Sequence, residues 1–253
     1  MQYALQLLSA VFNRQYVLYL LISGALTALL LFIAARYTRS ERLRDLPLVL
    51  SAVLTVLLHY SNLLVNYFQN GGSATIENNH ILPVYPCNVV MWVLLVAALL
   101  KNKQGIVFRT MAEFCFWAGS LCGIAGIVFN INFAGNPTLS DYYILKGLLS
   151  HSTMLYGCLY FKVGKFIKIR PSNAFSVAAG ILLFFVCGLG VNRLYERFGM
   201  NPPDGMLLLP NRFLPFSPLW LAILIVPLLY GALLLCERIA TKKKSTDVPK
   251  DTK

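Results

Sequence analysis

One cysteine of this sequence lies where helix chemistry would make it reactive. Cys87 follows Pro86 in the segment LPVYPCN at positions 82–88. Because proline is favoured at the first position of a helix, Pro86 predicts a helix that holds Cys87 in its first turn. The free N–H groups of a helix N-terminus stabilise a thiolate, which is the nucleophilic form of cysteine. Cys87 is therefore a candidate nucleophile, and the alternative is a small residue that only packs.

A nucleophilic cysteine needs a base, and two of the three histidines lie deep in long apolar segments. The rise along a helix places Cys87 about 21 Å, His151 about 16 Å and His59 about 18 Å from the basic end of their segments. We expect His151 to take the thiol proton, with His59 as its rival. A hydrogen-bonded core histidine is the alternative for His151. The third histidine, His80, falls in a polar connection, where we expect it to be solvated.

Further polar residues gather toward the same end of these segments as Cys87. Side-chain amides can orient an imidazole or donate to an oxyanion. We expect this role for four asparagines: Asn88, Asn130, Asn132 and Asn192. Lys146 is expected either to bind a lipid headgroup or to extend to the membrane surface. The six cysteines show no CxxC spacing, so we expect neither a metal site nor a cofactor.

The composition indicates what kind of fold must position these residues. Of the 253 residues, 57% are hydrophobic and 13% are charged, whereas an ordinary soluble domain carries about 25% charged residues. The mean hydropathy is +0.64. These values exclude a soluble globule, a disordered chain and a disulfide-stapled secreted module. Seven stretches are long and apolar enough for a helix to cross a bilayer. They span residues 17–35, 46–68, 82–100, 106–129, 143–161, 175–191 and 216–236.

The basic residues predict the orientation of these crossings. Most of the 22 Lys and Arg residues lie in the connections 36–46, 101–109 and 162–170 and in the tail. Because cytoplasmic loops carry the excess of Lys and Arg, we predict an all-α polytopic membrane protein with its N-terminus outside and its C-terminus cytoplasmic. Residues 1–239 form a single transmembrane domain, and 240–253 form a basic tail. The net charge of +12 thus indicates a membrane surface, and no nucleic-acid partner is expected.

The segment LPVYPCN resembles the LPLHLC[DN] signature of YwaF-like integral membrane proteins. The likeness continues through the segment FWAG at 116–119, His151 and Asn192. In the branch of that family that builds polyunsaturated ether phospholipids in animals, the motif cysteine carries the acyl group and a histidine assists it. The resemblance implies those roles for Cys87 and His151. The sequence departs from the signature at Tyr85, where the family often has His, and at Pro86, where Leu is usual.

The leading hypothesis is a membrane-embedded lipid acyltransferase that works through a Cys–His pair and an acyl-cysteine thioester. A lipid hydrolase with the same pair is the first alternative. A non-catalytic seven-helix receptor or carrier is the second, although 216–236 holds no lysine for a retinal Schiff base. The expected partners are the bilayer and its phospholipids, in the cell (plasma) membrane. The donor lipid, the acceptor lipid and the oligomeric state stay open.

Overall fold

The computed structural model describes residues 13–37, 41–69, 71–72, 81–128, 130, 133, 138–168, 174–203 and 205–208, with positions 227, 228, 231, 232, 234, 235 and 238. Every regular element in this part of the chain is helical. In order, the elements are α2 (Arg14–Tyr37), α3 (Glu41–Gln69), α5 (Pro86–Leu99), α6 (Ile106–Phe114), the π-helix η1 (Cys115–Gly119), α7 (Ser120–Val128), α9 (Tyr142–Val163), α10 (Ala174–Arg197) and the 3₁₀ turn η3 (Gly205–Leu207).

The helices correspond to six of the seven predicted stretches. The stretch at 106–129 is built from α6, η1 and α7, which follow one another without a break. The stretch predicted to begin at 82 begins instead at Pro86. The residue before a proline is driven out of the helical region, and Tyr85 is extended with φ −111° and ψ 153°. The seventh stretch, 216–236, falls almost wholly outside the described residues.

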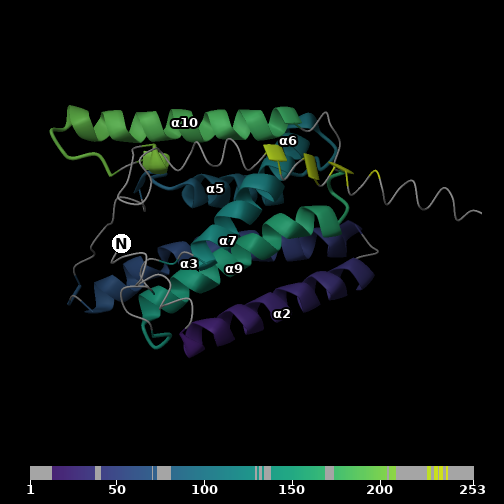
Figure 1. Ribbon diagram of the computed structural model, residues 1–253, viewed down its shortest axis with the longest axis horizontal. Coiled ribbons are helices and arrows are strands. Elements are labelled where there is room, and N and C mark those ends of the chain that lie inside the picture. The colour runs from purple at the N-terminus through teal and green to yellow at the C-terminus, as the bar shows by residue number, and fades with distance from the viewer. Residues whose placement is uncertain are drawn as a thin grey trace, which may run out of the picture.

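Within the described part of the chain, four helical segments are long and apolar enough to cross a membrane: Arg14–Arg36, Leu43–Gln69, Ile106–Val128 and Ser176–Arg197. The helix Pro86–Leu99 is apolar but shorter. Helix α9 is as long as these spans but more polar, and it contacts α2, α3, α5 and α7. Figure 1 shows α9 running between α2 and the other helices of this group. Polar side chains at membrane depth face the bundle interior, which fits the contacts of α9 on several sides.

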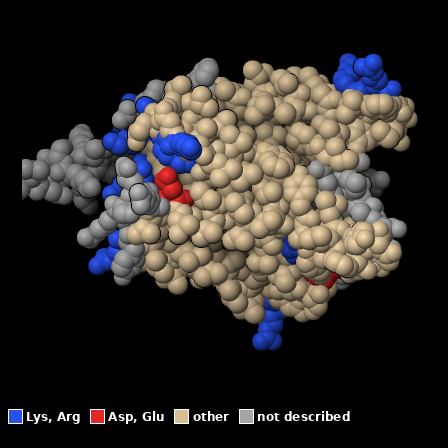
Figure 2. Space-filling model, turned by 180° about the vertical axis from the view of Figure 1, so that it is seen from behind, with Lys and Arg blue, Asp and Glu red and all other residues tan. Residues whose placement is uncertain are grey.

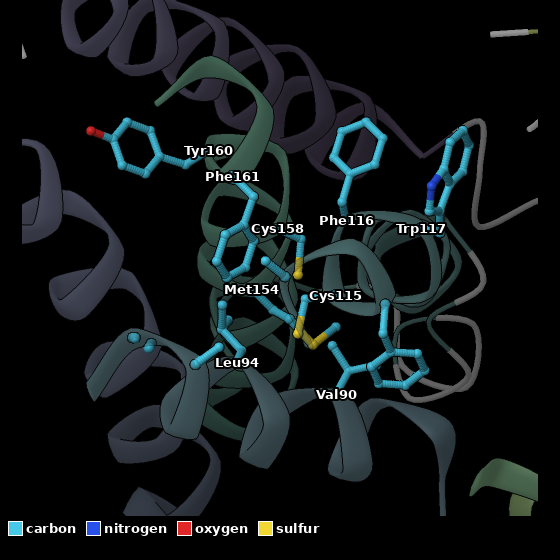
Figure 3. Packing of buried hydrophobic residues seen from close by; sticks show 14 of the residues in the cluster. Val90, Leu94, Cys115, Phe116, Trp117, Met154, Cys158, Tyr160 and Phe161 are labelled. Carbon is cyan, nitrogen blue, oxygen red and sulfur yellow. The ribbon is translucent and has the colours of Figure 1, made fainter. Parts of the chain in front are cut away.

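The core lies where α5, η1 and α9 meet. Val90 and Leu94 of α5 are fully buried there, together with Cys115 and Cys158. Figure 3 shows Cys115 and Cys158 within this cluster, together with Met154. Gly119 allows α9 to approach η1 closely, because a Cβ at that position would lie 2.2 Å from the Sγ of Cys158.

The outer surface of the bundle suits a lipid environment. On the face shown in Figure 2 the Lys and Arg side chains lie mainly near the edges, and a broad uncharged surface lies between them. Large apolar side chains are exposed along α2 and α3, among them Leu21, Phe32, Leu57 and Leu64. On a soluble protein, a large exposed apolar patch would mark a surface that contacts another molecule. For this protein, lipid tails are the expected partner.

Candidate functional site

The first turn of α5 carries the predicted nucleophile. Pro86 is the first residue of the helix, so the helix start predicted from the sequence is confirmed. The Oδ1 of Asn88 accepts a hydrogen bond from the N–H of Tyr85 at 2.9 Å, which fastens the turn. The Sγ of Cys87 faces the backbone N–H groups of Cys87 and Asn88. The thiol therefore lies at the N-terminal end of α5, among the free N–H groups of the first turn.

Helix α7 lies near both Cys87 and His151. Cys122 of α7 lies within electrostatic range of Cys87. Gly126 follows one turn later, and a Cβ there would lie 2.3 Å from Cε1 and 2.4 Å from Nδ1 of His151. Residues four apart on a helix share a face, with Cβ atoms about 5–6 Å apart. His151 thus packs against α7 one turn from Cys122, which lies within electrostatic range of Cys87.

The imidazole of His151 has its two nitrogens in different surroundings. Its Nδ1 is buried against Gly126 and has no hydrogen-bond partner among the residues that the structure describes. This leaves Nε2 as the nitrogen that can reach a thiol or a substrate. His59 and Lys146 both lie within electrostatic range of the ring.

His59 reaches the site from α3. The Nδ2 of Asn88 donates to the Nε2 of His59 at 3.5 Å. Because Asn88 follows Cys87 in the chain, His59 lies beside the first turn of α5. The structure therefore places His59 beside the residue that follows Cys87, and it places His59 within electrostatic range of His151.

The remaining predicted site residues lie in different parts of the bundle. The Oδ1 of Asn130 accepts from the N–H of Phe133 at 3.0 Å, and its Nδ2 lies 3.7 Å from the position that a Cβ on Gly147 of α9 would take. The Oδ1 of Asn192 accepts from the N–H of Gly205 at 2.7 Å, which fastens η3 to α10. Lys146 is half-buried on α9. Asn132 lies outside the described residues.

Helix α3 carries further buried polar residues that were not predicted as site residues from the sequence. Four of them are buried: Ser51, Thr55, Asn62 and Asn66. Their spacing of four, seven and four residues places them on one face of the helix. That spacing inside an apolar segment is a signal that could have identified them. Among the described residues, no group of three His, Cys, Asp or Glu side chains could hold a metal ion.

These contacts can support proton transfer and covalent chemistry within a helical bundle that carries several apolar spans. A model of one protein family matches residues 11–236, which is most of the chain. No curated protein and no solved structure gives a match. The apolar helices and the family match together identify an integral, multi-pass membrane protein. The chain belongs to the TMEM164 family.

Proposed function

We propose that the protein is a membrane-embedded lipid acyltransferase in which Cys87 carries the acyl group and His151 is its base. The observation that supports this most is the packing of His151 against Gly126 of α7, one turn from Cys122, which lies within electrostatic range of Cys87. The position of Cys87 in the first turn of α5 adds to it, because the N-terminus of a helix favours a thiolate. The resemblance to YwaF-like proteins implies the same two residues.

The first half-reaction loads the enzyme. His151 takes the proton of the Cys87 thiol, and the sulfur attacks the ester carbonyl of a donor phospholipid. The ester C–O bond breaks and a C–S bond forms. The leaving alkoxide takes the proton back from the imidazolium and departs as a lyso-lipid.

The second half-reaction reverses these roles. The hydroxyl of an acceptor lyso-lipid gives its proton to His151 and attacks the thioester carbonyl. The C–S bond breaks, and the thiolate recovers the proton from the imidazolium. A hydrolase would differ only in using water as the acceptor.

Acyl-thioester labelling tests the proposal. Purified protein in a bilayer of phosphatidylcholine with alkyne-tagged acyl chains should acquire a label that hydroxylamine removes. Cys87→Ser should reduce this label to background, because a serine hydroxyl is far less acidic than a thiol. Cys187→Ser is the matched control, since Cys187 is a half-buried thiol on α10. Wild-type labelling of Cys87→Ser would overturn the acyl-cysteine mechanism.

Labelled product separates transfer from hydrolysis. With a lyso-lipid added, a transferase should return the tagged chain as a new phospholipid, whereas a hydrolase should release it as free fatty acid. His151→Ala should slow label formation, and His59→Ala should leave it near wild type. The reverse order would make His59 the base, which its position beside Asn88 would then explain.

We also propose seven crossings with the N-terminus outside, in the plasma membrane. The distribution of basic residues supports this orientation. Lys101→Cys and Ser140→Cys test it, since both positions are exposed and lie in different connections. A membrane-impermeant maleimide applied to intact cells should label Ser140→Cys above the wild-type background and Lys101→Cys only after permeabilisation. The opposite pattern would invert the topology.

A further inference from the structure

Helices α3 and α9 are joined along their length by polar contacts. Near one end of the pair, the hydroxyl of Tyr143 donates to the Oδ1 of Asn66. Further along, Thr153 and Thr55 share a hydrogen bond of 3.0 Å between their hydroxyls. From the first contact to the second, the residue number rises by ten along α9, from 143 to 153, and falls by eleven along α3, from 66 to 55. The helices are therefore antiparallel, and the register between them is fixed.

Lys146 lies on the face of α9 that this seam defines. Tyr143, Lys146, Ser150 and Thr153 recur at intervals of three and four residues, which is the spacing of one helix face. The members on either side of Lys146 contact α3: Tyr143 contacts Asn66, and the hydroxyl of Ser150 donates to the carbonyl oxygen of Thr55 at 3.4 Å. Lys146 is accordingly directed toward α3.

The register gives the height of Lys146. Counting from the Thr55–Thr153 contact places it level with Asn62, a buried residue that is 2% exposed, and counting from the Tyr143–Asn66 contact places it one residue further along α3. Asn130 lies at the same height, because its amide lies beside Gly147. A cation and two side-chain amides therefore lie at one level of the bundle. Helical side chains tilt toward the N-terminus of their helix, so the Lys146 ammonium extends toward the Asp141 end of α9.

The reacting groups lie below this level. His151 is five residues beyond Lys146, which corresponds to about 7.5 Å along the axis. On α3, His59 is three residues below Asn62, or about 4.5 Å, and it contacts Asn88 beside Cys87. In a glycerophospholipid, the atoms P–O–C–C–O–C connect the phosphorus to the carbonyl carbon of the ester at the central glycerol position. This short chain spans a distance of the same size.

We propose that Lys146 binds the phosphate of a phospholipid substrate and so places its acyl ester at the level of Cys87 and His151. This inference rests on the proposed function and adds a requirement for an anionic phosphate in the headgroup. Asn62 and Asn130 flank the phosphate at the same height. An ammonium that is partly withdrawn from water holds a phosphate more strongly than a fully solvated one does. A neutral glyceride lacks that contact and binds more weakly.

Binding of uncleavable lipids tests this subsite without relying on catalysis. The probes are a dialkyl phosphatidylcholine, whose ether linkages cannot be cleaved, and the matching dialkylglycerol, which lacks the phosphate. Native mass spectrometry in a neutral detergent gives the dissociation constant of each. Wild-type protein should bind the phosphatidylcholine more tightly than the glycerol. Lys146→Met should weaken phosphatidylcholine binding by about tenfold or more, and it should leave dialkylglycerol binding unchanged.

Three variants make the comparison specific. Lys162→Met removes a half-buried lysine at the other end of the same helix and should bind like wild type. Lys146→Arg keeps the charge and should retain most of the preference for the phosphate. Cys87→Ser should bind both probes normally, so the subsite and the acyl-cysteine mechanism can fail independently. Inorganic phosphate should not compete at concentrations that leave the protein folded, because the glycerol and chains also contribute to binding.

Several results would overturn the inference. Equal phosphatidylcholine affinity in wild type and Lys146→Met would exclude a phosphate contact at this residue. An equal loss for both probes would make Lys146 a structural residue of the α3–α9 seam. Full competition by inorganic phosphate would replace the lipid subsite with a site for a soluble anion.

Discussion

Replacing Gly126 with alanine is the sharpest test of the position of His151. A Cβ at residue 126 would lie 2.3 Å from Cε1, 2.4 Å from Nδ1 and 2.5 Å from Cγ of the imidazole. Ordinary van der Waals contact begins near 3.4 Å. The ring must therefore move by about 1 Å, and a displacement of that size costs about a hundredfold in rate when it misplaces a catalytic group. Gly126→Ala should thus slow acyl-thioester formation about a hundredfold.

The assay is a single-turnover measurement. Wild type and Gly126→Ala are mixed with vesicles of alkyne-tagged phosphatidylcholine, and hydroxylamine-sensitive label is followed with time. Thermal unfolding in detergent is measured in parallel, because crowding of a packed site also costs about 1–3 kcal/mol of stability. Gly190→Ala and Gly24→Ala are the controls, since a Cβ at either position meets nothing within 4 Å. Both should label at the wild-type rate, and their helices should gain up to about 1 kcal/mol.

A double variant shows whether the effect passes through the imidazole. If Gly126→Ala acts only by displacing His151, it should slow a His151→Ala enzyme no further, because groups that act as a unit are not additive. An additional hundredfold loss in the double variant would refute the reasoning. Labelling of Gly126→Ala at the wild-type rate would refute it as well, since the ring cannot keep its position beside an alanine.

Three further predictions concern the packing around the site. Gly119→Ala should destabilise the protein by about 1–3 kcal/mol because its Cβ would lie 2.2 Å from the Sγ of Cys158. Adding Cys158→Ala should restore part of that stability, as measured by unfolding in detergent. If the double variant recovers no stability, the clash is not the cause. Asn192→Ala should cost about 1–3 kcal/mol, since it leaves the buried N–H of Gly205 unpaired; a loss of thioester labelling at unchanged stability would instead give Asn192 a role with substrate. Burial lowers the pKa of Lys103, so the unfolded chain binds more protons in the range just below its usual value of about 10.4, and stability should rise with pH there. Lys103→Met should lose that rise in pH-dependent unfolding, and an unchanged slope would assign it to another group.

The α5 site shows how far local sequence determines the fold. Pro86 set the start of the helix, because the constraint acts on the residue itself and on its neighbour Tyr85. It therefore also placed Cys87 in the first turn before any tertiary contact was known. Apolar stretches likewise predicted the helices that the structure describes, since the length of a crossing depends only on consecutive residues.

The partners of these residues depended on contacts that the sequence does not encode locally. Hydropathy predicts that a helix is buried in a membrane but not which helix it faces, because many faces are equally apolar. Gly126 appears in the sequence as one small residue among many, and only the approach of α9 gives it a role beside His151. The position of His59 beside Asn88 likewise depends on the packing of α3 against α5.

The composition, the helix positions and the presence of a candidate nucleophile were determined by the sequence alone, because each follows from residues close together in the chain. The neighbours of that nucleophile were decided by the tertiary structure. Close helix packing requires small residues opposite large ones, and the register of α3 against α9 is fixed by pairs such as Thr55 and Thr153. Those residues are far apart in the sequence, so only the folded bundle brings Lys146 and His59 within electrostatic range of His151 and places His59 beside Asn88.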